Sequence, residues 1–236
     1  MIKQCAFLSL FILVGLTALP AQATTITTFS DKSTFLAFTG ATSATGVLPN
    51  LGLISGGSSA SQTVGSVTFT IAAPSTDIYL GTQGLLFSTW TTLLPGNQIA
   101  LSGSENLNAA LASPVFTLGF DFVEPLLDSP PGKPSGYYCP CVDSTFTVTL
   151  KNSGATVGSF TFNAPDDVAA FVGVQSSSAF NRVEIRETIG GIDNEYFGQV
   201  YTNTTLVENP EPSTVLLMGM GSGALLLWGR YRKTNV

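Results

Sequence analysis

Histidine is absent from the 236-residue sequence, and cysteine and methionine occur only three times each. Without histidine the chain has neither a Ser-His-Asp nor a Cys-His catalytic arrangement, and it lacks the imidazole ligands of ordinary zinc and copper sites. Charged side chains make up only 10% of the sequence. These shortages exclude histidine-dependent hydrolases and leave paired carboxylates as the acid–base chemistry to consider.

Positive charge is especially scarce in the central part of the chain. Between residue 24 and Glu211 there are 15 acidic but only five basic side chains, a formal net charge of −10. Phosphate contacts require clustered Lys and Arg, so we expect no nucleic-acid partner. The acidity is compatible with solubility outside the cell and with calcium.

The N-terminus has the features of a secretory signal peptide. Lys3 precedes an apolar run over residues 6–19, and Ala21-Gln22-Ala23 provides the small-x-small pattern that signal peptidase requires. We therefore expect residues 1–23 to be a signal peptide, removed after export through the Sec machinery.

The C-terminus combines an apolar run with a basic tail. Residues 213–229 predict a short transmembrane helix in the inner membrane. Trp228 suits the membrane interface, and Arg230, Arg232 and Lys233 would remain on the cytoplasmic side. This orientation agrees with an exported body.

Pro210-Glu211-Pro212, the apolar run and the basic tail follow one another in the order of a known sorting signal. Residues 208–236 resemble the PEP-CTERM sorting signal of Gram-negative bacteria. The resemblance implies recognition by an exosortase, transient anchoring in the inner membrane and processing near the Pro-Glu-Pro motif. It also implies a final place in the outer envelope, at the cell surface or in an extracellular biofilm matrix.

Residues 24–207 are predicted to form one all-β domain. Apolar residues alternate with threonine and other polar residues in three segments, 66–71, 116–122 and 145–150, as in strands with one buried face. Together with the turn residues between them, these segments predict a two-sheet antiparallel β-sandwich of about ten short strands. Further strands are expected at 25–29, 84–88, 98–101, 156–162, 169–174, 180–186 and 195–201.

A short helix and two loops complete the predicted domain. The helix is expected over Asp31–Phe38, capped by Ser30 or Asp31. Residues 41–61 and 128–136 are rich in Gly, Ser and Pro, and we predict loops there.

Residues 171–200 resemble the closing strands of the jelly-roll ectodomains that are common in PEP-CTERM proteins. This resemblance implies a jelly-roll-like sandwich, but it implies no activity, since such sandwiches serve binding, adhesion and purely structural roles. The matching residues are Phe171, Gly173, Val174, Phe180, Val183, Ile185, Ile192, Asp193, Asn194, Phe197 and Gly198.

Two groups of residues are candidate structural sites. Cys139 and Cys141 could form a local disulfide, bridge two molecules or bind a soft metal, and in an exported protein we favour the disulfide. Asp193 and Asn194 could bind structural calcium together with Asp31, although Asp-Asn is also an ordinary turn dipeptide.

Three functions fit these observations. The first is a non-catalytic structural or adhesive protein of the envelope or matrix. The second is a carbohydrate-binding module that retains exopolysaccharide, with sugars stacking on Tyr79, Trp90, Tyr137 or Tyr138. The third is a secreted hydrolase that uses paired carboxylates. Its candidate residues are Asp166, Asp167, Glu184 and Glu187. The two aspartates also fit an ordinary turn, and Glu184 also fits the solvated face of a strand.

Overall fold

The structure, a computed structural model, describes residues 24–81, 94–124, 143–166, 168–190 and 195–207. Within these ranges nearly all regular structure is β. The elements are β1 (Ile26–Phe29), α1 (Lys32–Thr39), β2 (Thr42–Ser43), β3 (Gly52–Ser55), the 3-10 turn η1 (Gly57–Ser59), β4 (Ser61–Val64), β5 (Val67–Ile71), β6 (Asp77–Gly81), β7 (Gln98–Leu101), β8 (Leu107–Val123), β9 (Thr145–Asn152), β10 (Ala155–Phe162), β11 (Ala169–Ile189) and β12 (Tyr196–Asn203).

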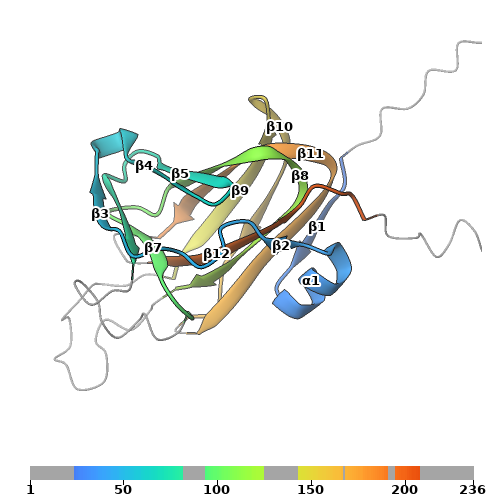
Figure 1. Cartoon of the computed structure of the whole chain (residues 1–236), viewed down its shortest axis with the longest axis horizontal. Coiled ribbons are helices and arrows are strands. Elements are labelled where there is room, and N and C mark those ends of the chain that lie inside the picture. The colour runs from blue at the N-terminus through green and yellow to red at the C-terminus, as the bar shows by residue number, and fades with distance from the viewer. Residues whose placement is uncertain (1–23, 82–93, 125–142, 167, 191–194, 208–236) are drawn as a thin grey trace, which may run out of the picture.

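Strands β8 and β11 bend and belong to both layers of a sandwich (Figure 1). Residues 107–111 of β8 pair with β5 and with the second half of β11, whereas residues 117–123 pair with β12 and with the first half of β11. Layer 1 has the strand order β4-β5-β8-β11-β9-β10. Layer 2 has the order β1-β11-β8-β12-β7-β6-β3, with β2 beside β12. All these strand pairs are antiparallel, which confirms the all-β, antiparallel prediction. The two layers are joined through the long strands β8 and β11 into one continuous sheet, whereas the sequence predicted two sheets of short strands.

The core lies between the two layers and follows the predicted alternation. Apolar side chains from β5, β8, β9, β11 and β12 face one another there, while the threonines between them face outward. Phe122 is fully buried and contacts Phe146 and Phe162 at ring distances of 5.4 and 5.3 Å, near-perpendicular arrangements that aromatic pairs favour.

Helix α1 covers the outer face of layer 2. Phe35 is fully buried against Phe171, with 5.1 Å between the ring centres. Lys32 Nζ donates to both carboxylate oxygens of Asp121 at 2.9 and 3.0 Å, and it lies 4.4 Å from the centre of the Tyr201 ring. The helix thus buries Asp121, which sits on the polar side of β8.

The two ends of the described domain lie together at the bend of β11. Thr24 Oγ1 is 3.1 Å from Ser178 Oγ, and Gln175 Nε2 donates to the carbonyl oxygen of Val207 at 2.5 Å. The start of β1 and the segment that follows β12 lie on the same side of the domain in Figure 1.

Most predicted elements are confirmed, but two are wrong. The predicted strand 98–101 is β7, and the predicted helix is α1 within one residue, with Asp31 as its N-cap. Residues 41–61 were expected to be a loop but contain β2, β3 and η1, because β3 pairs with β6, a strand the sequence pattern did not predict. Segments 169–174 and 180–186 are parts of one strand, since β8 stays paired with β11 around the bend. Residues 84–88 and 128–136 lie outside the described ranges.

Nothing among the described helices combines the length and hydropathy needed to cross a membrane. The predicted signal peptide and the predicted membrane span at 213–229 lie outside the described residues.

Two glycines with similar backbone angles offer a matched stability test. Gly65 turns the β4–β5 hairpin at φ +59°, and a Cβ there would lie 2.2 Å from the carbonyl oxygen of Ala44; Gly46 has φ +65° and open space around it. We expect Gly46→Ala to cost about 1 kcal/mol of unfolding free energy, and Gly65→Ala at least about 2 kcal/mol because the clash adds to the backbone strain. Chemical denaturation measures both, and equal losses would contradict the clash.

Candidate functional site

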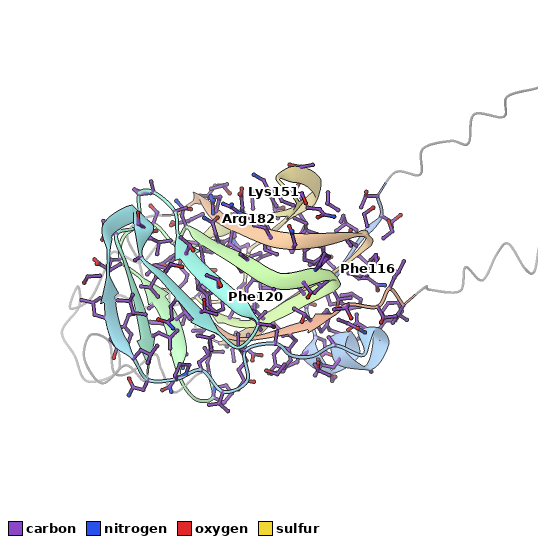
Figure 2. The ribbon with its side chains drawn as sticks, turned by 45° about the horizontal axis from the view of Figure 1, so that its top comes forward. Phe116, Phe120, Lys151 and Arg182 are labelled. Carbon is purple, nitrogen blue, oxygen red and sulfur yellow. The ribbon has the colours of Figure 1, made fainter. Side chains whose placement is uncertain are left out.

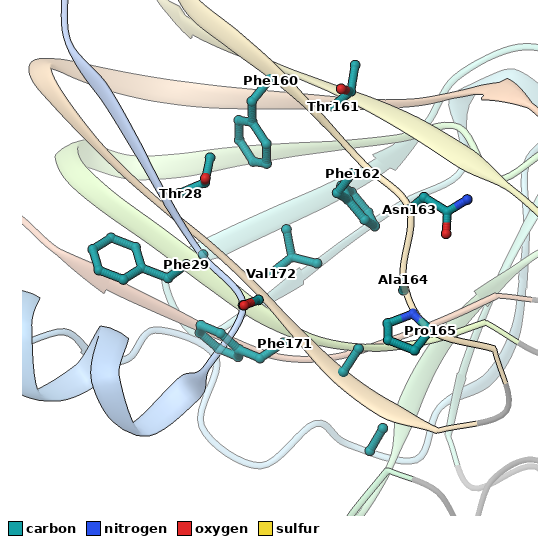
Figure 3. A pocket seen from close by; sticks show the side chains of 14 residues that line it. Thr28, Phe29, Phe160, Thr161, Phe162, Asn163, Ala164, Pro165, Phe171 and Val172 are labelled. Atoms are coloured by element: carbon teal, nitrogen blue, oxygen red, sulfur yellow. The ribbon is translucent and has the colours of Figure 1, made fainter.

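An open cleft of about 440 Å³ lies where the edges of the two layers meet (Figure 3). One wall comes from β10 and the segment after it, and the other comes from β1 and the first residues of β11. This volume falls within the range of small-ligand sites. The cleft is lined by residues 28–30, 160–165 and 169–173.

The cleft exists because β1 is much shorter than β11. The ladder between the two strands ends at Phe29 opposite Gly173, so residues 169–172 extend past β1. On the opposite wall the chain leaves β10 after Phe162, and residues 163–166 cross toward layer 2. The two layer edges therefore diverge and leave part of the interior accessible.

Aromatic rings and small polar groups share the surface of the cleft. Phe29, Phe160 and Phe162 are half-buried, and Figure 3 shows both β10 phenylalanines on the wall opposite Val172. Such a surface can contact the apolar face of a ligand and hydrogen-bond its hydroxyl groups. The exposed polar side chains that line it are Thr28, Ser30, Thr161 and Asn163.

Three carboxylates gather beside this cleft. Glu124, Asp143 and Asp166 place carboxylate oxygens within 4.8 Å of one another, and we call these residues the acid cluster. Asn163, which lines the cleft, donates Nδ2 to Asp143 Oδ1 at 2.6 Å, and the backbone N–H of Ser144 donates to Glu124. Carboxylate oxygens suit calcium, so the acid cluster could hold such an ion.

The calcium ligands proposed from the sequence are different residues. Asp31 caps α1, where its carboxylate accepts hydrogen bonds from the backbone N–H of Thr34 and from Ser33 Oγ, both at 2.7 Å. Hydrogen bonds from Thr34 and Ser33 lower the pKa of Asp31 from its ordinary 3.8 to about 2. Asp193 and Asn194 lie outside the described residues.

The glutamates proposed for a hydrolase are engaged in the fold. Burial acts to raise the pKa of Glu184, but the hydrogen bond from Lys151 and the attraction of the nearby guanidinium groups outweigh it, so this pKa is lowered. Glu187 Oε2 accepts a hydrogen bond from the backbone N–H of Glu105 at 2.9 Å. Neither glutamate lines the cleft, whereas Asp166 lies beside it in the acid cluster.

Tyr79 was a candidate sugar-stacking residue, and this prediction is wrong. Its side chain is only 9% exposed and packs with Leu94, Ala100, Val123 and Tyr196, because β6 is an inner strand of layer 2. The remaining candidates lie outside the described residues: Trp90, Tyr137, Tyr138, Cys139, Cys141, Asp167, Pro210, Glu211, Pro212, Trp228, Arg230, Arg232 and Lys233.

The sequence did not identify the residues of the cleft. Phe160 and Phe162 alternate with polar residues, as in any strand with one buried face, and nothing local indicates that this face stays partly open. The only available signal is Pro165, which follows the two phenylalanines closely and ends the edge strand.

Comparisons with known proteins identify no family. No family model matches the chain, and no curated protein matches it. A mutant of the family 29 carbohydrate-binding module CBM29-2 superposes with a TM-score of 0.31 at 14% identity, over 48% of this chain and 77% of its own. The C-terminal family 22 carbohydrate-binding module of Clostridium thermocellum Xyn10B gives 0.32 at 12% identity, over 62% and 91%.

An enzyme domain superposes to a similar degree. The catalytic domain of a GH87 alpha-1,3-glucanase gives a TM-score of 0.33 at 14% identity, over 63% of this chain but only 30% of its own. At such TM-scores the likenesses to binding modules and to an enzyme carry no weight in assigning a ligand or an activity to this chain.

The Asp31 cap predicts a specific pH dependence. Because the folded-state pKa is depressed, the stabilisation is present above the ordinary pKa of 3.8 and is lost as the pH falls to about 2. Asparagine is a comparable N-cap that does not titrate. We expect the wild-type melting temperature to fall relative to that of Asp31→Asn between about pH 4 and about pH 2. A difference that stays constant over this range would contradict the assignment.

Proposed function

We propose that this chain is an exported, non-catalytic module that binds a neutral polysaccharide in the cleft between β1, β10 and β11. The observation that carries the proposal is the cleft lining, which combines half-buried phenylalanines with exposed hydroxyl and amide side chains. The C–H face of a sugar ring packs against aromatic rings, while its hydroxyl groups hydrogen-bond with Thr, Ser and Asn.

The absence of ionisable groups from the lining favours a neutral sugar. Among the residues that the structure describes, 14 line the cleft, and none of these is acidic or basic. An anionic ligand entering this partly apolar space would lose hydration without gaining a charged partner, and this loss opposes binding. The desolvation cost of a neutral sugar is smaller, because its hydroxyl groups can exchange water for protein hydrogen bonds.

A binding role without catalysis agrees with the positions of Glu184 and Glu187, the two glutamates that the sequence offered for hydrolysis. Glycoside hydrolysis requires two carboxyl groups on either side of the scissile bond. Glu184 is held by basic neighbours and Glu187 by a backbone N–H, and both lie away from the cleft lining. We therefore propose retention of, or adhesion to, a polysaccharide rather than its cleavage.

The export and sorting part of this proposal rests on the sequence of the two ends. We propose that Pro210-Glu211-Pro212 and the segment after it are recognised by an exosortase after export. Prolines restrict the backbone and resist helix formation, so the motif would remain extended beside the membrane and accessible to a processing enzyme. The domain would then act in the outer envelope or the extracellular matrix.

Phe160 is the residue of choice for testing the cleft. We expect Phe160→Ala to weaken binding of a neutral oligosaccharide at least about tenfold, because it removes a stacking surface from β10. Calorimetric titration with gluco-, manno- and xylo-oligosaccharides measures the affinity, and the length of the recovered sugar reports any cleavage.

Leu53→Ala is the matched control, since Leu53 is a 58% exposed apolar residue of β3 that does not line the cleft. We expect this variant to bind as the wild type does. Equal weakening in both variants, or binding of no oligosaccharide by the wild type, would contradict the glycan proposal.

Replacing Pro210, Glu211 and Pro212 by alanine tests the sorting signal. We expect the precursor to accumulate uncleaved in the membrane fraction, because the processing enzyme loses its motif. Intact mass measurement after cell fractionation follows this. Normal release of the triple-alanine variant would refute the sorting proposal and leave the cleft proposal untouched.

A further inference from the structure

The outer face of layer 1 carries a cluster of basic residues on two neighbouring strands. Arg182, Glu184 and Arg186 alternate along β11, and Lys151 of β9 lies opposite Arg182. Figure 2 shows Lys151 and Arg182 close together on this face. We call Lys151, Arg182 and Arg186, with Glu184 between them, the basic patch.

Glu184 holds the three cations in place without neutralising them. Its carboxylate lies 2.9 Å from Lys151 Nζ, 3.1 Å from Arg182 and 3.8 Å from Arg186. The Glu184 side chain is only 16% exposed, whereas those of Lys151, Arg182 and Arg186 are 26%, 46% and 31% exposed. The positive groups are therefore more accessible to solvent than the carboxylate that orients them, and the patch has a net charge of +2.

Arg186 is fixed by further hydrogen bonds. Its guanidinium donates to the carbonyl oxygens of Ile185 and Leu107 at 2.7 and 3.1 Å, and to Asn108 Oδ1 at 2.6 Å. A preorganised guanidinium loses less conformational entropy when it binds an anion.

This concentration of positive charge contrasts with the rest of the chain. The described residues include only four basic side chains, and three of them are in the basic patch; the fourth, Lys32, is bound to Asp121 on the outer face of layer 2. The whole segment from residue 24 to Glu211 carries a net charge of −10. A positively charged surface on an otherwise negatively charged molecule attracts anionic partners to that face.

Rows of hydroxyl groups border the basic patch on both sides. Thr147 and Thr149 of β9 lie directly opposite Arg186 and Glu184. Ser159 of the next strand, β10, lies opposite Thr149. On the other side, the β4–β5 hairpin contributes outward hydroxyls. These are Ser61, Thr63, Thr68 and Thr70.

We propose that the basic patch and its hydroxyl borders bind an acidic polysaccharide through the carboxylates of its uronate units. Guanidinium and ammonium groups form charge-assisted hydrogen bonds with carboxylates, and the surrounding hydroxyls match those of sugar rings. Lys151 and Arg182 face each other on adjacent strands, which lie about 4.8 Å apart, whereas Arg186 lies about 13 Å along β11 from Arg182. A sheet face of this kind accommodates an extended chain.

The same charges fit nucleic acid poorly. A duplex carries one phosphate charge per about 1.7 Å, and its binding requires a broad basic surface. Here a net charge of +2 sits on a strongly acidic domain, which repels a dense polyanion. An acidic glycan, with about one carboxylate per sugar ring, matches this sparse charge better.

The basic patch is separate from the cleft lining, so this proposal does not depend on the proposed function.

The test uses a hexamer of polygalacturonate and its neutral methyl ester as probes of the exported domain. We expect binding of the acid but not of the ester, and a loss of affinity of at least about tenfold when NaCl is raised from about 0.05 to about 0.5 M. Arg182→Gln and Lys151→Gln should each weaken binding about three- to tenfold.

Charge changes of opposite sign sharpen the test. Ser159→Lys adds one positive charge to this face and should strengthen binding about three- to tenfold. Ala37→Glu, at an exposed position of α1 on the other layer, lowers the net charge as Arg182→Gln does and should leave binding unchanged. Phe160→Ala should also leave it unchanged, which separates this site from the cleft.

The proposal would be overturned if Arg182→Gln and Ala37→Glu weakened hexamer binding equally, or if the wild type did not bind the hexamer at low salt. It would also be overturned if the wild type bound the methyl ester, or a single-stranded oligonucleotide of the same charge, as tightly as it binds the acid. Melting temperatures establish that each variant is folded, and Ser159→Lys, at an exposed position, keeps the test decisive if Arg182→Gln or Lys151→Gln does not fold.

Discussion

The pairing of β8 with β11 is the constraint on which both layers depend. The two strands stay in antiparallel register from Ala169 opposite Val123 to Ile185 opposite Leu107, although both turn from one layer into the other. Register shifts around Phe180 absorb the turn, as β-bulges do where strands change direction. Because the same two strands form the centre of each layer, neither layer can separate from the other without breaking this ladder. The core residues of the two faces are thereby fixed opposite one another.

Both proposed binding surfaces follow from the way shorter strands are added to this central pair. β1 extends along only part of β11, and the uncovered remainder opens the cleft. β9 pairs with the other half of β11 and brings Lys151 beside residues that are distant in the sequence. β10 takes part in both surfaces, since Phe160 and Phe162 line the cleft while Ser159 faces outward beside the basic patch. The edge strand β10 thus lies between the uncharged cleft and the basic patch.

The sequence predicted those features that depend on one strand alone. Val67, Phe69 and Ile71 alternate with threonine, and burial of one face is sufficient to specify such a strand. The α1 cap was predicted to be Ser30 or Asp31 for the same reason, and it is Asp31, which acts within its own turn. Features that need two distant segments were not predicted. Strand β3 is defined by its pairing with β6, the buried position of Asp121 by α1, and the cleft by the unequal lengths of β1 and β11. None of these pairings leaves a local pattern in either segment.

The position of the two ends of the domain has a consequence for its use in other proteins. Thr24 and Val207 are both held by residues at the bend of β11, so the first and last strands finish beside each other. A fold with neighbouring termini can be joined end to end by a short linker, or inserted into a surface loop of a host, without disturbing its sheets. The β9–β10 turn at Ser153 and Gly154 is exposed and offers a place to reopen the chain. A circular permutant of this kind would start at β10 and end at β9 while keeping every strand pair of the sandwich.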